Sequence, residues 1–152
     1  MSNFKTYIKS ILMPVIAGGI VGFIISGFID YDTLQKPALA PPSIFFPIIW
    51  TILYILMGVS YGILKTNNLV DPKIDSIYYL QLIVNLLWPI AFFIFKARLF
   101  SFIWIILLAI LVAIMIYRFW RKNKIAGLLQ IPYLLWTLFA TYLNLFVYIL
   151  NK

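Results

Sequence analysis

Five continuous apolar segments, each about as long as one bilayer crossing, dominate the chain. They cover residues 7–28, 43–64, 74–95, 99–119 and 125–150. A helix needs roughly 20 apolar residues to cross a hydrocarbon core about 30 Å thick. The segments do not alternate between apolar and polar residues, so spanning helices are favoured over the strands of a barrel. We therefore expect an all-α integral membrane protein, a single domain over residues 1–152 that forms a bundle of five transmembrane helices.

The composition agrees with a chain that lies in lipid. Hydrophobic residues make up 64% of it and charged residues 11%, whereas a soluble domain is about half apolar and a quarter charged. Lys5 and Lys9 precede an apolar run that is longer than the core of a signal peptide, so we expect a retained helix. The net charge of +8 is not gathered on a folded soluble surface, so no nucleic-acid partner is expected.

Several kinds of chemistry lack the residues that they need. The sequence contains no cysteine and no histidine, which removes disulfides, zinc sites, the usual haem ligands and the commonest general base. The four acidic residues lie in polar segments or at their edges: Asp30, Asp32, Asp71 and Asp75. No ionisable group lies at mid-membrane, which argues against a proton relay or an ion-coupled carrier. We expect no metal site, no resident cofactor and no acid–base catalysis.

The basic residues predict an orientation. Of the 12 Lys and Arg residues, eight fall on the side of the N-terminus: Lys5, Lys9, Lys65, Lys73, Arg118, Arg121, Lys122 and Lys124. The positive-inside rule then places the N-terminus inside and the C-terminus outside. The absence of a presequence and the Lys/Ile-rich character favour a bacterial plasma membrane.

Polar and aromatic residues recur at helical spacing in three segments. In the third segment Gln81, Asn85 and Trp88 lie at i, i+4 and i+7, which is one helix face. Similar faces carry Pro47, Trp50, Tyr54 and Tyr61 in the second segment, and Tyr133, Thr137, Ala140, Asn144 and Tyr148 in the fifth. Six of the residues in these segments fall between mid-depth and the outer surface, so they share the outer half of the membrane: Trp50, Asn85, Trp88, Trp136, Ala140 and Asn144. They predict either helix-to-helix hydrogen bonds or a pocket with aromatic walls for a large, planar, apolar ligand.

Two further stretches bear on such a pocket. Residues 29–42 form the one long connection, and Pro37, Pro41 and Pro42 make it stiff and non-helical. It would cover the outer end of the bundle as a lid. In the first segment Gly18, Gly22 and Ser26 form a ridge of small residues, which suits either packing inside the bundle or a dimer face.

Three sequence blocks follow one another along the chain. The first block is Tyr31–Gly58, with Leu34-Gln35-Lys36-Pro37 and Pro41-Pro42. The second is Gln81-x-x-x-Asn85-x-x-Trp88-Pro89-x-x-Phe92-Phe93. The third is Pro132-Tyr133-x-x-Trp136-x-x-Phe139-Ala140-x-x-x-Asn144. In these three blocks the sequence resembles the tryptophan-rich sensory protein/translocator protein (TspO/MBR) family.

The resemblance implies a five-helix bundle that is often a homodimer. It implies a membrane receptor or sensor for porphyrins such as protoporphyrin IX, for haem and for benzodiazepine-type ligands. The ligand-binding residues would be Tyr31, Pro41, Trp50, Asn85, Trp88, Trp136, Ala140 and Asn144. Some bacterial members promote light-dependent oxidative breakdown of protoporphyrin IX, and Trp50 and Trp136 match the tryptophans tied to that reaction. A transporter of tetrapyrroles or other apolar molecules is a further alternative.

The chain departs from the family pattern at two loop positions. Asp30 stands where relatives often carry tryptophan before the loop tyrosine, and Leu39 replaces the tryptophan of the proline-rich motif. Both changes remove aromatic surface from the expected lid.

Overall fold

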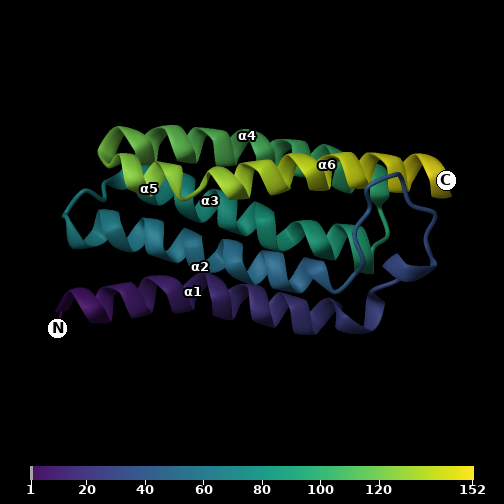
Figure 1. Ribbon diagram of the computed structural model, residues 1–152, viewed down its shortest axis with the longest axis horizontal. Helices are drawn as coiled ribbons and strands as arrows, with labels where there is room; N and C mark the ends of the chain where they lie inside the picture. Colours follow the sequence, from purple (N-terminus) through teal and green to yellow (C-terminus); the bar gives the residue numbers. More distant parts are fainter. Residues whose placement is uncertain (1) are drawn as a thin grey trace.

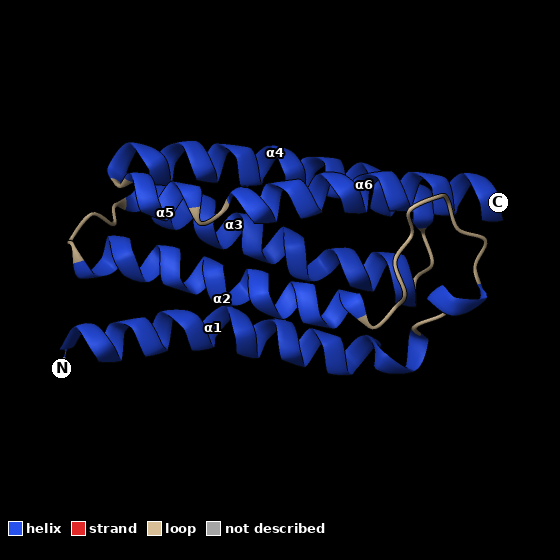
Figure 2. Ribbon diagram, in the orientation of Figure 1, coloured by secondary structure: helices blue, strands red, loops and turns tan. Residues whose placement is uncertain are grey.

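The computed structural model describes residues 2–152, and all of its regular structure is helical (Figure 2). The α-helices are α1 (Ser2–Ile25), α2 (Phe45–Thr66), α3 (Pro72–Pro89), α4 (Arg98–Lys122), α5 (Lys124–Leu128) and α6 (Ile131–Asn151). Short 3-10 turns follow α1 at Ser26–Phe28 and at Tyr31–Thr33, and a π-helix, η3 (Ile90–Ile94), continues α3.

Five stretches of the described chain are long and apolar enough to cross a membrane. They run side by side along the bundle axis, with the two termini at opposite ends (Figure 1). The loop between α1 and α2 lies at the end that holds the C-terminus, which we call the lid end (Figure 1). Helix α1 packs on α2 and touches α3, while α4 packs on both α3 and α6. The expected all-α bundle of five transmembrane helices is confirmed.

The fifth apolar segment differs from the single helix expected over 125–150. A turn at Leu129 and Gln130 divides it into α5 and α6. Pro132 stands in the first turn of α6 and has no N–H, so the chain cannot continue a regular helical ladder through this point. The new helix begins here because proline is well tolerated in a first helical turn.

Proline also changes the end of the third segment. After Pro89 the helix widens into the π-helical turn η3, which places Ala91 and Phe92 in the interior. Pro89 lacks the N–H that the carbonyl of residue 85 would accept in a regular helix, and such disturbances are common causes of π-turns and kinks. The turn contacts both α1 and α4.

Glycine allows α1 and α2 to approach closely. A Cβ atom added to Gly58 on α2 would collide with the α1 backbone at Ser10 and Ile11. Gly18 on α1 lies against the ring of Tyr54. The small-residue ridge of α1 therefore packs inside the bundle at Gly18, and this position serves the contact between helices of one chain.

We predict that Gly58→Ala destabilises the bundle, because the added methyl group meets backbone that cannot rotate away. Overpacking of this kind typically costs about 1–3 kcal/mol. Gly19→Ala is the matched control, since nothing lies within 4 Å of its added Cβ. Thermal unfolding in detergent should show a lower Tm for Gly58→Ala alone, and equal Tm values for the two variants would contradict the prediction.

Candidate ligand pocket

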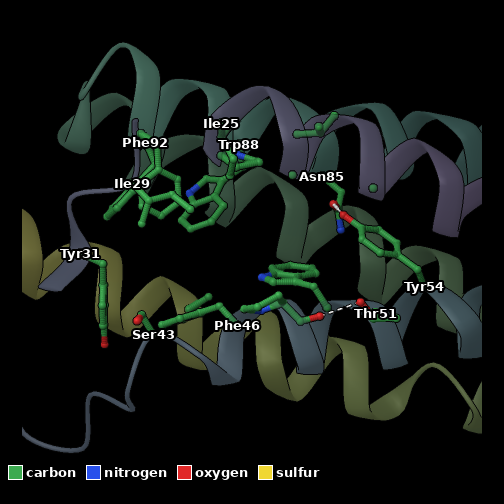
Figure 3. Close-up of a pocket in the computed structure, with 18 of the residues that line it drawn as sticks. Ile25, Ile29, Tyr31, Ser43, Phe46, Thr51, Tyr54, Asn85, Trp88 and Phe92 are labelled. Atoms are coloured by element: carbon green, nitrogen blue, oxygen red, sulfur yellow. Dashed lines mark hydrogen bonds between the residues drawn. The ribbon is translucent and has the colours of Figure 1, made fainter. Parts of the chain in front are cut away.

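A cavity lies at the lid end, between α1, α2, α3 and α6. Its volume is about 600 Å³, which falls within the roughly 300–1,000 Å³ typical of small-molecule sites. Helix α6 and the lid close it opposite α1 (Figure 3). The lining includes Gly18, Gly22, Ile25, Ile29, Tyr31, Ser43, Phe46, Pro47, Trp50, Thr51, Tyr54, Asn85, Trp88, Phe92, Phe93, Ala140, Leu143 and Asn144.

Aromatic rings form opposite walls of this pocket. Trp50 lies on α2, with its ring stacked at 6.0 Å from that of Tyr54 and edge-on at 6.4 Å to that of Trp136. Trp88 and Phe92, with ring centroids 5.1 Å apart, stand on the α3 side (Figure 3). Every described residue that lines the cavity is uncharged. The space therefore suits a flat, apolar molecule with little charge in its buried part.

A chain of hydrogen bonds forms the floor. The Tyr54 hydroxyl donates to Asn85 Oδ1 at 2.6 Å, and Asn85 Nδ2 donates to the Tyr133 hydroxyl at 2.7 Å. The Tyr133 hydroxyl in turn donates to Gln81 Oε1 at 2.7 Å. All four side chains are buried. The chain joins α2, α3 and α6 at one level, so the floor is rigid and its polar groups already have partners.

A second set of bonds holds the wall near the lid. The indole N–H of Trp88 donates to Asn144 Oδ1 at 2.9 Å, and the Asn144 amide donates to the backbone carbonyl of Arg98 at 2.8 Å. The Arg98 guanidinium lies 4.8 Å from the centre of the Phe92 ring and donates to the Phe92 carbonyl. The orientation of Trp88 thus depends on the first residue of α4.

Asp30 connects this wall to the lid. Its two carboxylate oxygens accept hydrogen bonds from Arg98 at 2.7 and 2.8 Å, and Lys96 lies 3.1 Å away. Partial burial by itself raises the pKa of Asp30, but the bonds from Arg98 and Lys96 outweigh this effect and hold the pKa below its usual value. The carboxylate is therefore charged at neutral pH and ties the lid to the start of α4.

The rest of the lid is fixed by hydrogen bonds to its own residues and to α6. The hydroxyl of buried Tyr31 donates to the Pro41 carbonyl at 2.7 Å, and the Tyr31 ring contacts that of Phe46. Tyr142 donates to the carbonyl of Ala38 at 2.7 Å, and Asn151 exchanges two hydrogen bonds with the backbone of residue 35. The prolines thus stiffen a loop that α6 also holds in place.

The structure brings most of the residues expected at the site into one cavity. Six of them line it: Tyr31, Trp50, Asn85, Trp88, Ala140 and Asn144. Pro41 and Trp136 lie outside the lining. The Pro41 carbonyl accepts a hydrogen bond from the Tyr31 hydroxyl, and the Trp136 ring packs against those of Trp50 and Phe46. These two residues touch the wall rather than the space.

The site residues expected from the sequence include none on α1, although small residues there can leave room beside a ligand. Gly18, Gly22 and Ile25 line the cavity, and the small-residue ridge was the signal that could have located them. From the sequence, Asp30 signals only the loss of an aromatic side chain, whereas in the structure it forms the ion pair with Arg98 that holds the lid. Leu39 is 82% exposed with φ of 72° and does not line the cavity, so the side chain at this position is directed away from the site.

We predict that Asp30→Asn loosens the lid, because it removes the charge that Arg98 and Lys96 share. A partly exposed pair of this kind contributes about 1 kcal/mol. Hydrogen exchange of residues 30–42 should become roughly fivefold faster. Since the folded pKa is lowered, the contribution is complete above pH ~4 and is lost as the pH falls through that folded value.

Asp32→Asn is the matched control for this experiment. It removes the same charge from the same loop, yet Asp32 makes only a long 3.4 Å contact with Ser43 through its carboxylate. If both variants accelerate exchange equally, the Asp30 pair does not hold the lid.

Helices that cross the membrane five times around an aromatic pocket under a tethered loop define a small, polytopic integral membrane protein. The chain belongs to the TspO/MBR family, whose sequence profile matches residues 10–150. It is 37% identical over 124 residues to the tryptophan-rich protein TspO of Chlorobaculum tepidum. The aligned residues make up 80% of this chain and 78% of the relative.

Two more distant comparisons agree with this assignment. Identity to the tryptophan-rich protein TspO of Archaeoglobus fulgidus is 34% over 152 residues, or 98% of this chain and 99% of the relative. Identity to the human translocator protein is 32% over 120 residues, or 75% of this chain and 70% of the relative. The match thus extends over bacterial, archaeal and animal proteins.

Proposed function

We propose that this protein is a membrane receptor or sensor that binds porphyrins, chiefly protoporphyrin IX, and benzodiazepine-type ligands in the pocket beneath the lid. The observation that carries the proposal is the cavity of about 600 Å³ with uncharged, aromatic walls. Membership of a family whose relatives are named TspO and translocator protein supports the receptor role. A porphyrin offers the wide, flat, apolar face that such walls favour.

The pocket's chemistry also bears on which form of porphyrin binds. Tyrosine oxygen can ligate haem iron, and the described lining contains two tyrosines, Tyr31 and Tyr54. Both hydroxyls already donate hydrogen bonds, to Pro41 and to Asn85. Binding would therefore rest on shape and ring stacking. The acidic edge of a porphyrin would lie toward the lid, where Ser43 offers a hydroxyl.

We predict that Ala140→Phe abolishes binding by filling the cavity. Ala140 is buried and lines the pocket, so a phenylalanine ring at this position would occupy the ligand's space. Ala113→Phe is the control, because Ala113 is exposed on α4 and outside the lining. Titration of tryptophan fluorescence with protoporphyrin IX should show at least a tenfold weaker Kd for Ala140→Phe, about 1.4 kcal/mol, with no change for Ala113→Phe.

The same titration tests the mode of binding. Haem is expected to bind no more tightly than the metal-free porphyrin. Equal affinity of Ala140→Phe and the unchanged protein would show that porphyrin binds elsewhere. Flux of porphyrin into liposomes, in excess of that explained by binding, would favour the alternative of a transporter.

A second activity, light-dependent oxidative breakdown of protoporphyrin IX with dioxygen as the oxidant, is favoured by one specific contact. Trp50 lines the pocket, and Trp136 meets its ring edge-on at 6.4 Å. The pair offers two easily oxidised rings in series, the first of which is on the cavity wall. No acid–base group is required of them.

We predict that Trp50→Phe combined with Trp136→Phe slows bleaching of bound protoporphyrin under illumination by at least fivefold, while binding changes little because aromatic surface is kept. Trp120→Phe is the control, since Trp120 lies on α4 near the other end of the bundle. The measurement is the decay of porphyrin absorbance in light and in darkness. Unchanged bleaching in the double variant would exclude this role for the pair.

We also propose the membrane setting. The N-terminus would lie inside and the C-terminus outside a bacterial plasma membrane, with the lid facing outward. Termini at opposite ends of the bundle support an odd number of crossings (Figure 1). A homodimer is proposed by family resemblance, and its face would lie outside the Gly18 contact with Tyr54.

A further inference from the structure

Helix α3 begins and α4 ends at the end of the bundle opposite the lid (Figure 1). A second hollow lies between these two helix ends. Its volume is about 330 Å³. Four cationic side chains and a single carboxylate surround it, together with Ile74 and one aromatic ring: Lys73, Arg118, Arg121, Lys122, Asp71 and Tyr117. The hollow is therefore strongly basic.

The one carboxylate does not neutralise this hollow. Asp71 accepts the backbone N–H of Ile74 as the cap of α3 and forms an ion pair with Lys122 at 2.8 Å. Among the ion pairs of the described chain, none involves Lys73 or Arg121. Arg118 uses one nitrogen to donate to the Lys73 carbonyl, which fixes its guanidinium beside the start of α3. An anion would thus meet an excess of positive charge held in place by α3 and α4.

The exposed faces of α4 lead from this charge into the membrane. Arg121, Tyr117, Ile114 and Ile110 are spaced by four, three and four residues, so they form one stripe along α4. Tyr117 is 60% exposed, and Ile114 and Ile110 are exposed as well. The stripe runs from a cation through an aromatic ring to aliphatic side chains.

Helix α3 carries a parallel series. Lys73 is followed at seven, ten and fourteen residues by Leu80, Ile83 and Leu87, all exposed apolar side chains on the same face. A cation at the membrane surface followed by apolar residues at greater depth is the order in which a phospholipid presents its phosphate and its acyl chains. A free inorganic anion would use only the first part of either series.

We propose that this hollow binds the phosphate group of an anionic phospholipid, whose acyl chains lie along the exposed faces of α3 and α4. Lys73, Arg118 and Arg121 hold the phosphate, and Tyr117 covers the glycerol region. The site lies at the other end of the bundle from the aromatic pocket, so it is independent of porphyrin binding. Anionic lipid would then stabilise the contact between α3 and α4.

The test measures lipid binding to the full-length protein by native mass spectrometry in detergent. Phosphatidylglycerol and phosphatidylcholine are supplied at equal concentration, and inorganic phosphate is supplied in a separate arm. We expect one preferred phosphatidylglycerol adduct. Lys73→Gln with Arg121→Gln should weaken its binding by at least roughly tenfold, since each basic group near an anionic lipid contributes a factor of about five.

Two variants control for charge and for folding. Lys5→Gln with Lys65→Gln removes the same charge from exposed positions outside the hollow and should leave binding within twofold. Arg121→Lys keeps the charge and should keep most of the affinity. Equal loss in both double variants, no preference for phosphatidylglycerol, or displacement of the lipid by inorganic phosphate at similar concentration would each overturn the proposal. Circular dichroism of both double variants confirms that they are folded.

Discussion

The structure depends on the rule that a polar group in hydrocarbon must find its partner within the protein. The hydroxyls of Tyr54 and Tyr133 and the amides of Asn85 and Gln81 obey it by bonding to one another. Because the four residues come from α2, α3 and α6, their bonds fix how these helices lie together. A helix in lipid gains little free energy from apolar contact with another helix. These bonds and the close glycine contacts therefore supply much of the specificity with which the helices pack.

The pocket follows from this arrangement. The polar floor lies below it, and the second set of bonds, from Trp88 through Asn144 to Arg98, lies beside it. Between them, large rings line the space without filling it. Asp30, Arg98 and Lys96 pair at the lid end, outside the lining, and the described residues that line the pocket are uncharged. The protein thus separates an apolar binding space from the charged groups that hold its cover.

Much of the fold could be predicted because membrane helices are specified locally. The face of α3 that carries Gln81, Asn85 and Trp88 follows from spacing alone, and all three residues are buried. The division between α5 and α6 could not be located from apolarity, since Pro132 interrupts the backbone bonds without lowering hydrophobicity. The wall made by Gly18 and Gly22 was ambiguous, because a small residue looks the same whether it faces a helix, a partner or a cavity.

The number of crossings, the lack of charge at mid-membrane and the residues available to a planar ligand can be derived from the amino-acid sequence. These properties depend on neighbours within one helix, or on composition. Three relations become visible once the helices are packed. Trp136 contacts Trp50, Asp30 pairs with Arg98, and Lys73 and Arg121 line the same hollow. Each of these relations joins residues far apart in the chain, and their distance is set by helix packing, which no local pattern encodes.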